Sequence, residues 1–313
     1  MKALVTGGAG FIGSNLVEML LGEGNEVVVL DDLSSGYREN VDPRAQLLEG
    51  DVSAPGAASA AAAGCHLIFH LAASVGNTRS IENPVRDSEI NCIGTLRVLE
   101  AAREHGIRRV VLSSSAGIFG ELKTLPIAED HPQDPDSPYG VSKLAAEKMC
   151  LVYNKLYGMK NIALRYFNVY GVRQRYDAYG NVIPIFAERM LRSQDVIIFG
   201  DGEQTRDFVN VRDVARANFL AGTSADAAGA FNVGSGTRIS INELARVMSE
   251  YLGGGATIVH GDARPGDVRD SLATTDAANR AFGFAPSVTM EDGLPQYLEW
   301  LRDDAVTHAR WKA

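Results

Sequence analysis

Tyr139 and Lys143 are the two residues whose types and spacing most directly suggest chemistry. They lie four residues apart in a segment expected to be helical, so both side chains emerge on the same helix face. A phenol is a weak base at its ordinary pKa of about 10, but a nearby ammonium group stabilises the phenolate and lowers that pKa. The pair therefore predicts a base that takes a proton from a substrate. An ordinary solvated helix face is the alternative.

Three serines, Ser113, Ser114 and Ser115, follow the apolar run 110–112 directly. We expect that run to be a buried strand of a parallel sheet, and such sheets bind ligands at the carboxyl ends of their strands. A serine hydroxyl at this place can hold the reacting oxygen of a substrate beside the phenol.

A glycine-rich turn made of Gly7, Gly10 and Gly13 stands between the apolar run 1–6 and a helix expected to begin near Phe11. Glycine permits a tight turn and the close approach of a pyrophosphate, whose charge is then met by free N–H groups at the helix N-terminus. The turn therefore predicts a dinucleotide site, with a chance cluster of glycines as the alternative.

Acidic residues follow two further apolar runs. Asp31 ends the second expected strand, where a carboxylate can accept hydrogen bonds from the adenosine ribose and repel a 2'-phosphate, and Asp32 adds negative charge. These residues predict NAD rather than NADP, with a capping or turn role for Asp31 as the alternative. The pair Asp51 and Val52 is placed either beside the adenine or in an ordinary turn.

The elements that must position these residues alternate between apolar runs and helix-length amphipathic stretches. Parallel strands can be joined only by crossovers, which are normally helical, so this alternation predicts a doubly wound parallel α/β sheet of the Rossmann type. Helices are expected over 88–105 and from Ser137 onward, the second with Leu144, Leu151 and Val152 on its apolar side. The expected strands are 3–5, 27–30, 67–71, 110–112 and 162–164.

A chain of 313 residues is expected to form two lobes. The alternating pattern ends near residue 170, so we expect an NAD-binding domain at 1–168, to which the chain returns around 207–235. The remaining residues of 169–313 are expected to form mainly a smaller, mixed α/β substrate domain. Its loops at 200–206 and 263–270 concentrate glycine and charge, as ligand-binding loops do.

Composition excludes several classes of function. The formal charge of −9 opposes nucleic-acid binding, which needs a basic face. Cys65, Cys92 and Cys150 are too scattered for a metal site or a disulfide, so we expect reduced thiols and no metal. Apolar runs fall short of the roughly 20 residues of a membrane span, and the N-terminus lacks a signal-peptide layout. We therefore expect no membrane partner and a cytoplasmic location.

Taken together, the motifs resemble those of the extended short-chain dehydrogenases/reductases over nearly the whole chain. They are G-G-A-G-F-I-G at 7–13, H-L-A-A at 70–73, S-S-S at 113–115, Y-G-V-S-K at 139–143 and R-Y-F-N-V-Y-G at 165–171. Within that family the chain is most similar to the UDP-glucose 4-epimerases. The resemblance implies Ser115 as the hydroxyl partner, Tyr139 as the base and Lys143 as its electrostatic support. Ser115 is preferred to Ser114 because it stands four residues before Phe119, which matches the tyrosine of the family's usual V-Y-G.

The resemblance also implies binding residues. For NAD they are Gly7, Gly10, Phe11, Ile12, Gly13, Asp31, Asp32, Asp51, Val52, Leu71, Ala72, Ala73, Asn91, Tyr139, Lys143 and Tyr166. For the UDP moiety of a substrate they are Asn168, Asn181, Arg206, Arg264 and Asp267, and guanidinium groups suit a diphosphate. Surface arginines of an acidic lobe are the alternative. A homodimer through helices 88–105 and 137–156 is implied as well.

Differences from related families narrow the reaction. Dehydratases and uronate decarboxylases carry acidic residues just after the catalytic hydroxyl, where this chain has Ala116 and Gly117, and uronate epimerases usually have threonine in place of Asn168. Ser271 stands where epimerases restricted to glucose and galactose have a bulky tyrosine, which predicts that N-acetylated UDP-hexosamines are accepted too, with an incidental loop serine as the alternative. We therefore expect a UDP-hexose 4-epimerase that works through a 4-keto sugar. A UDP-glucuronate 4-epimerase, a keto-sugar reductase and a non-catalytic NAD sensor or scaffold are the alternatives.

Overall fold

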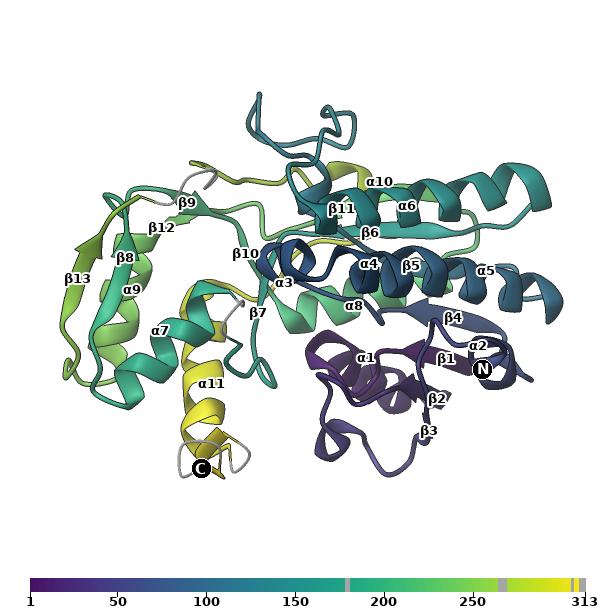
Figure 1. The fold of residues 1–313 in the computed structure, drawn as a ribbon, viewed down its shortest axis with the longest axis horizontal. Helices are drawn as coiled ribbons and strands as arrows, with labels where there is room; N and C mark the ends of the chain where they lie inside the picture. Colours follow the sequence, from purple (N-terminus) through teal and green to yellow (C-terminus); the bar gives the residue numbers. More distant parts are fainter. Residues whose placement is uncertain (178–180, 264–268, 305–306, 310–313) are drawn as a thin grey trace.

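A central sheet of seven parallel strands organises the computed structural model, which describes residues 1–177, 181–263, 269–304 and 307–309 (Figure 1). The strand order β11-β6-β5-β4-β1-β2-β3 confirms the predicted doubly wound sheet. The strands are β1 (Lys2–Thr6), β2 (Glu26–Asp31), β3 (Gln46–Glu49), β4 (Leu67–His70), β5 (Val110–Ser115), β6 (Ile162–Tyr166) and β11 (Gly229–Val233).

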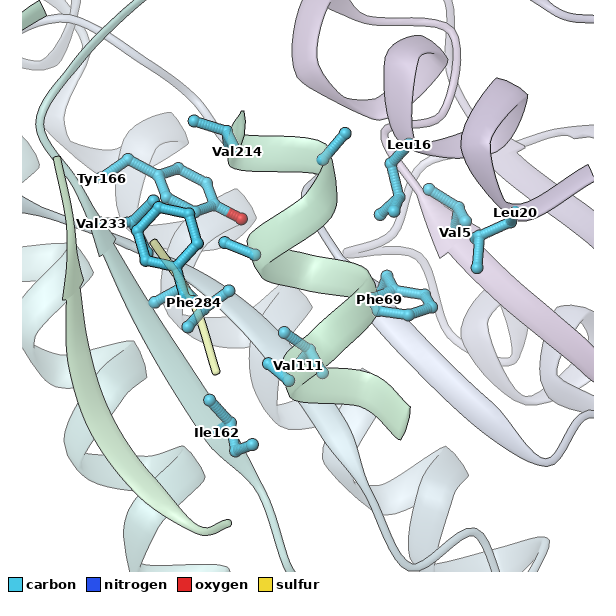
Figure 2. Close-up of a cluster of buried hydrophobic side chains, with 14 of the residues drawn as sticks. Val5, Leu16, Leu20, Phe69, Val111, Ile162, Tyr166, Val214, Val233 and Phe284 are labelled. Atoms are coloured by element: carbon cyan, nitrogen blue, oxygen red, sulfur yellow. The ribbon is translucent and has the colours of Figure 1, made fainter. Parts of the chain in front are cut away.

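Alternation along each strand divides the core into two layers, because successive side chains point to opposite faces of a sheet. Val5 packs on one face with α1, α8 and α10, whereas Leu4 packs on the other with α2, α5 and α6. Figure 2 shows Leu16 and Leu20 of α1 beside Val5 in the first layer. The helices of the two layers are α1 (Phe11–Gly22), α8 (Val211–Thr223), α10 (Asp276–Phe282), α2 (Ala57–Ala62), α5 (Thr95–Glu104) and α6 (Pro138–Tyr157).

The helix expected over 88–105 is confirmed, because the chain is helical from Glu89 to Glu104, but two features around it were not predicted. Helical structure begins earlier with α3 (Asn77–Glu82) and α4 (Pro84–Ser88), because Pro84 suits a first helical turn. It then passes through a π-helical segment, η2 (Glu89–Gly94), before α5. Hydrophobic spacing shows where a helix lies but not where its backbone widens to π geometry, a feature that is frequent at functional sites.

Helix α6 begins as predicted, with the Ser137 hydroxyl accepting a hydrogen bond from the Gly140 N–H at 3.1 Å. Its buried side agrees with the prediction only in part, because Leu144 packs against the buried cluster that contains Ile118 and Phe119. Small or polar side chains such as Ala146, Glu147 and Cys150 face the sheet, whereas Val152 is 43% exposed. The close approach of α6 to the sheet favours small residues there and leaves larger apolar groups outside.

A second group of elements packs around its own core at one side of the sheet (Figure 1). Helices α7, α9 and α11 enclose that core together with short strand pairs. The elements are β7 (Asn168–Tyr170), α7 (Val182–Leu191), β8 (Val196–Phe199), β9 (Thr205–Arg206), β10 (Phe208–Asn210), β12 (Ile239–Ser240), α9 (Ile241–Tyr251), β13 (Ile258–Gly261) and α11 (Met290–Asp303). Between β10 and β12 the chain supplies α8 and β11 to the central sheet. The division into an NAD-binding domain that ends at residue 168 and a substrate domain that follows it stays a proposal.

Candidate active site

The carboxyl ends of β1, β2, β4 and β5 open into a cleft of about 1050 Å³, which also receives side chains from the second lobe. Doubly wound sheets bind ligands at this edge. The predicted residues that line the cleft are Gly7, Gly10, Phe11, Ile12, Gly13, Asp31, Asp32, Asp51, Val52, Leu71, Ala72, Ala73, Ser115, Tyr139, Lys143, Tyr166, Asn168 and Asn181.

Two glycines of the turn between β1 and α1 occupy places that have no room for a side chain. Gly7 has a φ of 72°, and a Cβ atom on it would lie 2.6 Å from the backbone nitrogen of Ala72. A Cβ atom on Gly13 would lie 2.1 Å from the Gly7 carbonyl oxygen. With glycine at these places, Gly10 caps α1 and the N-terminus of the helix faces the cleft, a cradle that fits a pyrophosphate.

The segment after β4 is fixed against this turn by hydrogen bonds to Thr6. The Ala72 N–H donates to the Thr6 hydroxyl at 3.2 Å, and His70 Nδ1 lies 2.7 Å from the same hydroxyl. The other ring nitrogen of His70 is 3.0 Å from the Thr95 hydroxyl. Burial and, to a smaller extent, the nearby Lys143 lower the pKa of His70 to about 3, so this imidazole is neutral at physiological pH. His70 therefore positions the wall of the cleft.

Asp31 stands buried at the end of β2. One carboxylate oxygen accepts the N–H of Ala9 and the other accepts that of Leu33, both at 2.9 Å. Burial raises the pKa of Asp31, which these two hydrogen bonds only partly counteract. Each oxygen can accept a further hydrogen bond from a group in the cleft, as a carboxylate that binds ribose hydroxyls must.

Asp51 lines the cleft and also organises the turn after β3. It accepts hydrogen bonds from the Ser53 N–H at 2.8 Å and from Arg86 at 2.7 Å. Burial raises the pKa of Asp51, but the hydrogen bonds from Ser53 and Arg86 outweigh burial and lower it overall. Both of its sequence-based interpretations are therefore compatible with the structure, and Val52 is buried beside it.

Asn91 is placed differently from the other predicted cofactor residues. It lies in the π-helical segment η2, and among the described residues it is not part of the cleft wall. Its side chain accepts the Ser74 N–H at 2.9 Å and donates to Asp87 and Ser142. With these partners, Asn91 joins the segment after β4 to helices α4 and α6.

Ser115, Tyr139 and Lys143 meet at the carboxyl end of β5. The Ser115 side chain lies close enough to the Tyr139 phenol to lower its pKa, and the Ser115 Oγ accepts the Gly117 N–H at 3.1 Å. The Lys143 ammonium donates to the main-chain oxygen of Ser113 and lies 3.4 Å from its Oγ. The three predicted residues therefore lie together, and it is Ser115 that pairs with the phenol.

Their protonation differs from the expectation. Burial raises the pKa of Tyr139, the nearby Ser115 hydroxyl partly lowers it, and the Asp87 carboxylate raises it again. Burial lowers the pKa of Lys143 to about 8, against the opposing effects of Asp87 and Glu147. The expectation of a lowered pKa for Tyr139 is therefore wrong for the protein's own groups, because desolvation of the phenol outweighs the effect of Ser115, and the Lys143 ammonium is hydrogen-bonded to Ser113.

Two residues that sequence reasoning missed hold Tyr139 and Lys143 in place. The Ser80 hydroxyl accepts the Tyr139 N–H at 3.0 Å. Buried Asp87 accepts a 2.5 Å hydrogen bond from Ser142, the neighbour of Lys143. Neither residue lies in a recognisable motif, so only the packing of α3 and α4 against α6 reveals it.

Of the predicted substrate-binding residues that have a described position, only two are seen in the cleft wall. Asn168 and Asn181 line it, and their amides donate to the main-chain oxygens of Asp207 at 3.4 Å and Val169 at 3.3 Å. Among the residues that the structure describes, Arg206 and Ser271 lie outside the cleft wall. The Arg206 guanidinium donates to the Thr205 oxygen at 2.9 Å, and Ser271 is buried with its N–H bonded to that residue's oxygen. Arg264 and Asp267 lie outside the described residues.

Five consecutive residues of the second lobe, 173–177, also line the cleft and were not predicted. Their polar, turn-rich sequence carries no motif that distinguishes a wall of a site from a surface loop. Arg173 has a φ of 71°, a left-handed conformation that is uncommon for a residue with a side chain and points to a tightly constrained turn.

The described residues contain neither a candidate metal site nor a candidate membrane span. No group of three or more His, Cys, Asp or Glu side chains there is arranged to hold a metal ion. Within that part of the chain, no helix combines the length and the apolar character needed to cross a membrane. Cys65 and Cys150 are buried free thiols, and Cys92 is a half-buried one.

Comparison with known proteins gives full-length matches. A family model described as the NAD dependent epimerase/dehydratase family matches residues 3–234. A UDP-glucose 4-epimerase from Mycolicibacterium smegmatis is 38% identical over 314 residues, covering 97% of this chain and 99% of the relative. The structure of a Thermotoga maritima UDP-glucose 4-epimerase with UDP-glucose is 39% identical, with a TM-score of 0.93, over 96% of this chain and 99% of that chain. A complex of a Thermus thermophilus UDP-glucose 4-epimerase with NAD is 38% identical, with a TM-score of 0.90, over 97% and 100%.

The similar proteins extend to other sugars and another reaction. A UDP-N-acetylglucosamine 4-epimerase structure from Methanobrevibacter ruminantium is 33% identical, with a TM-score of 0.90, over 96% of this chain and 97% of that chain. A dTDP-glucose 4,6-dehydratase from Streptomyces niveus is 34% identical over 97% of this chain and 94% of the relative. Similarity alone therefore fixes neither the sugar nor the reaction.

Proposed function

Since the chain belongs to the NAD-dependent epimerase/dehydratase family, we propose that it is a UDP-hexose 4-epimerase that interconverts UDP-glucose and UDP-galactose. It is an NAD-dependent enzyme with UDP-glucose 4-epimerases among its relatives. The observation that carries the proposal is the approach of Ser115 to the Tyr139 phenol, with the buried Lys143 on the same helix as Tyr139. This arrangement can move one proton to and from a sugar hydroxyl.

The carboxylates of the cleft favour epimerisation over dehydration. A 4,6-dehydration needs an additional acid and base near C5 and C6 of the sugar, but the residues after Ser115 are Ala116 and Gly117. Among the described residues, the acidic side chains in the cleft wall stand elsewhere: Asp31 ends β2, Asp32 and Asp51 follow β2 and β3, and Asp177 is paired with Arg79. Within that described wall, the reacting end therefore offers a proton relay for one hydroxyl and no acid for elimination.

NAD fits the first lobe. The glycine turn at Gly7, Gly10 and Gly13 would hold its pyrophosphate, and Asp31 would hold the adenosine ribose. When bound, NAD⁺ supplies the hydride acceptor and a positively charged ring.

Tyr139 acts as the base in this proposal. Its phenolate takes the proton of the sugar 4-hydroxyl as C4 is oxidised, and it returns that proton to O4 when C4 is reduced on the opposite face. Ser115 holds O4 through its hydroxyl, and the Lys143 ammonium adds positive charge nearby. Because the proton and the hydride both return, the cycle is balanced and produces no net oxidation.

Inversion at C4 requires that the sugar turns over while its nucleotide stays fixed. We assign Asn168, Asn181, Arg206, Arg264 and Asp267 to the UDP group. Asn168 and Asn181 are supported by their place in the cleft wall, whereas the assignment of the other three depends on the family resemblance. We expect an Arg206→Met variant to raise KM for the UDP-sugar more than it lowers kcat.

Ser271 underlies the extension to UDP-N-acetylhexosamines. A serine in place of a bulky tyrosine leaves more room, and a UDP-N-acetylglucosamine 4-epimerase is among the similar structures. If a Ser271→Tyr enzyme kept the wild-type activity on UDP-N-acetylglucosamine, this extension would lose its basis.

A homodimer is part of the proposal. The outer surfaces of η2 and α6 expose Ile93, Val141, Val152 and Leu156, all more than 40% accessible. Apolar groups on neighbouring helices are typical of a subunit interface. Sedimentation equilibrium should give twice the chain mass, and a Val152→Lys/Leu156→Lys variant should give the single mass.

The function is tested by incubating the purified protein separately with UDP-glucose, UDP-N-acetylglucosamine and UDP-glucuronate. Both isomers of each sugar are quantified while the absorbance at 340 nm is followed. We expect UDP-glucose and UDP-galactose to interconvert without a net absorbance change. A preference for UDP-glucuronate would mean that the enzyme is a UDP-glucuronate 4-epimerase. Absorbance that changes in proportion to product would indicate a net redox enzyme, and the absence of any epimer would contradict the proposal.

A further inference from the structure

The segment Arg173–Asp177 crosses from the second lobe to the cofactor half of the cleft. All five residues line the cleft, although they follow β7 rather than any strand of the central sheet. The segment is therefore in a position to cover a dinucleotide bound along the carboxyl ends of β1 and β2.

Arg175 is the central contact of this segment. Its guanidinium forms a two-pronged ion pair with Asp304, at 2.8 and 2.7 Å, and donates to Asn40 Oδ1 at 3.0 Å. It also lies over the rings of Tyr37, at 4.3 Å, and Trp300, at 5.4 Å. Tyr37 and Asn40 follow β2, whereas Trp300 belongs to α11 and Asp304 directly follows it, so one side chain joins three parts of the molecule.

The β2 side of this cluster is bonded to the glycine-rich turn. The Tyr37 N–H donates to the Ala9 oxygen at 3.1 Å, and Asn40 Nδ2 donates to the same oxygen at 2.9 Å. The Ala9 N–H is in turn held by the Asp31 carboxylate. Arg175 is therefore linked through two residues to the turn and the carboxylate that are expected to hold the cofactor.

Two further ion pairs attach the same segment to the first lobe. Arg173 pairs with Glu18 of α1 at 2.5 Å, and Asp177 pairs with Arg79 of α3 at 2.7 Å. These two pairs are partly exposed, whereas the side chains of Arg175 and Asp304 are only 7% and 8% accessible. A buried pair is screened little by salt, and removing one partner leaves the other without compensation, so the Arg175 cluster should dominate.

We propose that Arg173–Asp177 is a strap that retains the dinucleotide, and that the Arg175 cluster with Asp304, Tyr37 and Trp300 locks it. Release of the cofactor then requires that the cluster opens. The proposal depends on NAD binding in this cleft but not on the identity of the sugar. It suits a reaction in which the cofactor is regenerated in every cycle and has no need to exchange.

The test compares cofactor retention in Arg175→Met, in Asp304→Asn, which keeps the side-chain shape, and in the double variant. Each protein is loaded with NAD and passed through a desalting column, and the NAD that remains per chain is measured over time after denaturation. Truncating one partner of a buried charge pair acts mainly on dissociation, so we expect loss about tenfold faster than in wild type for each variant. Because both residues contribute to one interaction, the double variant should lose NAD no faster than the singles.

Arg44→Met is the matched control. Arg44 also forms a two-pronged pair, with Asp42 at 2.9 and 2.7 Å, but it is exposed and lies outside the cleft wall that the structure describes. We expect it to retain NAD as wild type does. The strap would be refuted if Asp304→Asn retained NAD at the wild-type rate, or if Arg44→Met lost NAD as fast as the cluster variants. Should Arg175→Met fail to fold, Asp304→Asn decides the question alone. Because retention is measured without sugar, failure of the epimerase assay leaves this result independent.

Discussion

The two ends of the cleft are built on different physical principles. At the reacting end, Ser115, Tyr139 and Lys143 are held by hydrogen bonds, and burial shifts the pKa values of Tyr139 and Lys143 toward their neutral forms. At the adenosine end, Arg175 forms a buried ion pair with Asp304, which is flanked by partly exposed pairs. At the reacting end, burial favours the uncharged forms of the two titratable side chains. At the adenosine end, two opposite charges neutralise each other and join the two lobes.

The difference predicts that changes at the reacting end affect the chemical step, whereas changes at the strap affect how long the cofactor stays. The following variants test that division, from the largest expected effect to the smallest.

Tyr139→Phe should lower kcat by about 10³-fold, because it removes the proton acceptor, and general base catalysis contributes roughly 10²–10⁴-fold. NAD content after desalting should stay near the wild-type level. Tyr153→Phe is the control on the same helix, since Tyr153 bonds Glu100 and not the cleft. A Tyr139→Phe enzyme with more than a tenth of wild-type kcat would contradict the assigned role.

Ser115→Ala and Ser114→Ala should separate catalysis from stability. Ser115 faces the phenol, so its loss should lower kcat by about 10–100-fold with little change in unfolding free energy. Ser114 is buried and donates to Glu147 at 2.7 Å, so its loss should cost about 2 kcal/mol of stability and leave kcat within a few-fold. Urea unfolding and steady-state kinetics measure the two effects. The opposite pattern would move the hydroxyl role to Ser114.

Lys143 should make the stability of the NAD-free protein depend on pH. Its pKa is about 8 when folded and about 10.5 when unfolded, so between these values the unfolded chain binds more protons and stability rises with pH. Relative to Lys143→Met, the wild-type unfolding free energy should therefore increase from pH 8 to 10.5, by about 3 kcal/mol at most. If the difference in unfolding free energy between the two proteins stayed constant over that range, burial would not lower the pKa of Lys143.

The partly exposed pairs of the strap should matter least. Arg79→Met and Glu18→Gln each remove a pair of the kind that contributes about 0–1 kcal/mol, so NAD loss should accelerate by less than about fivefold. Raising the salt concentration should reduce even that effect. If either variant released NAD faster than Asp304→Asn, the lock would lie in the rim pairs rather than in the Arg175 cluster.

The sequence predicted that the glycine turn and the residues proposed to react would lie at one edge of the sheet, because their signals are local. Gly7, Gly10 and Gly13 lie within one turn, Tyr139 and Lys143 lie on one helix face, and Ser115 ends a recognisable strand. That these groups share one cleft follows from the order of the parallel strands, whose carboxyl ends lie at the same edge of the sheet.

The rest depended on contacts that no local pattern records. Arg175 contacts Tyr37 and Asp304, which are separated from it by more than a hundred residues, and Asp87 reaches the site only because α4 packs against α6. The net shift in the pKa of Tyr139 was likewise hidden, since it depends on the balance between desolvation and the groups near the phenol.

The central claim is reversible oxidation and reduction at C4 of a UDP-hexose, and it is tested most directly with UDP-glucose that carries deuterium at C4. The enzyme is allowed to reach equilibrium, and both isomers are analysed by mass spectrometry and NMR. The account predicts that deuterium stays at C4 in UDP-glucose and UDP-galactose alike, with no loss to solvent. Loss of deuterium to water would contradict the account, and so would formation of another product in place of UDP-galactose.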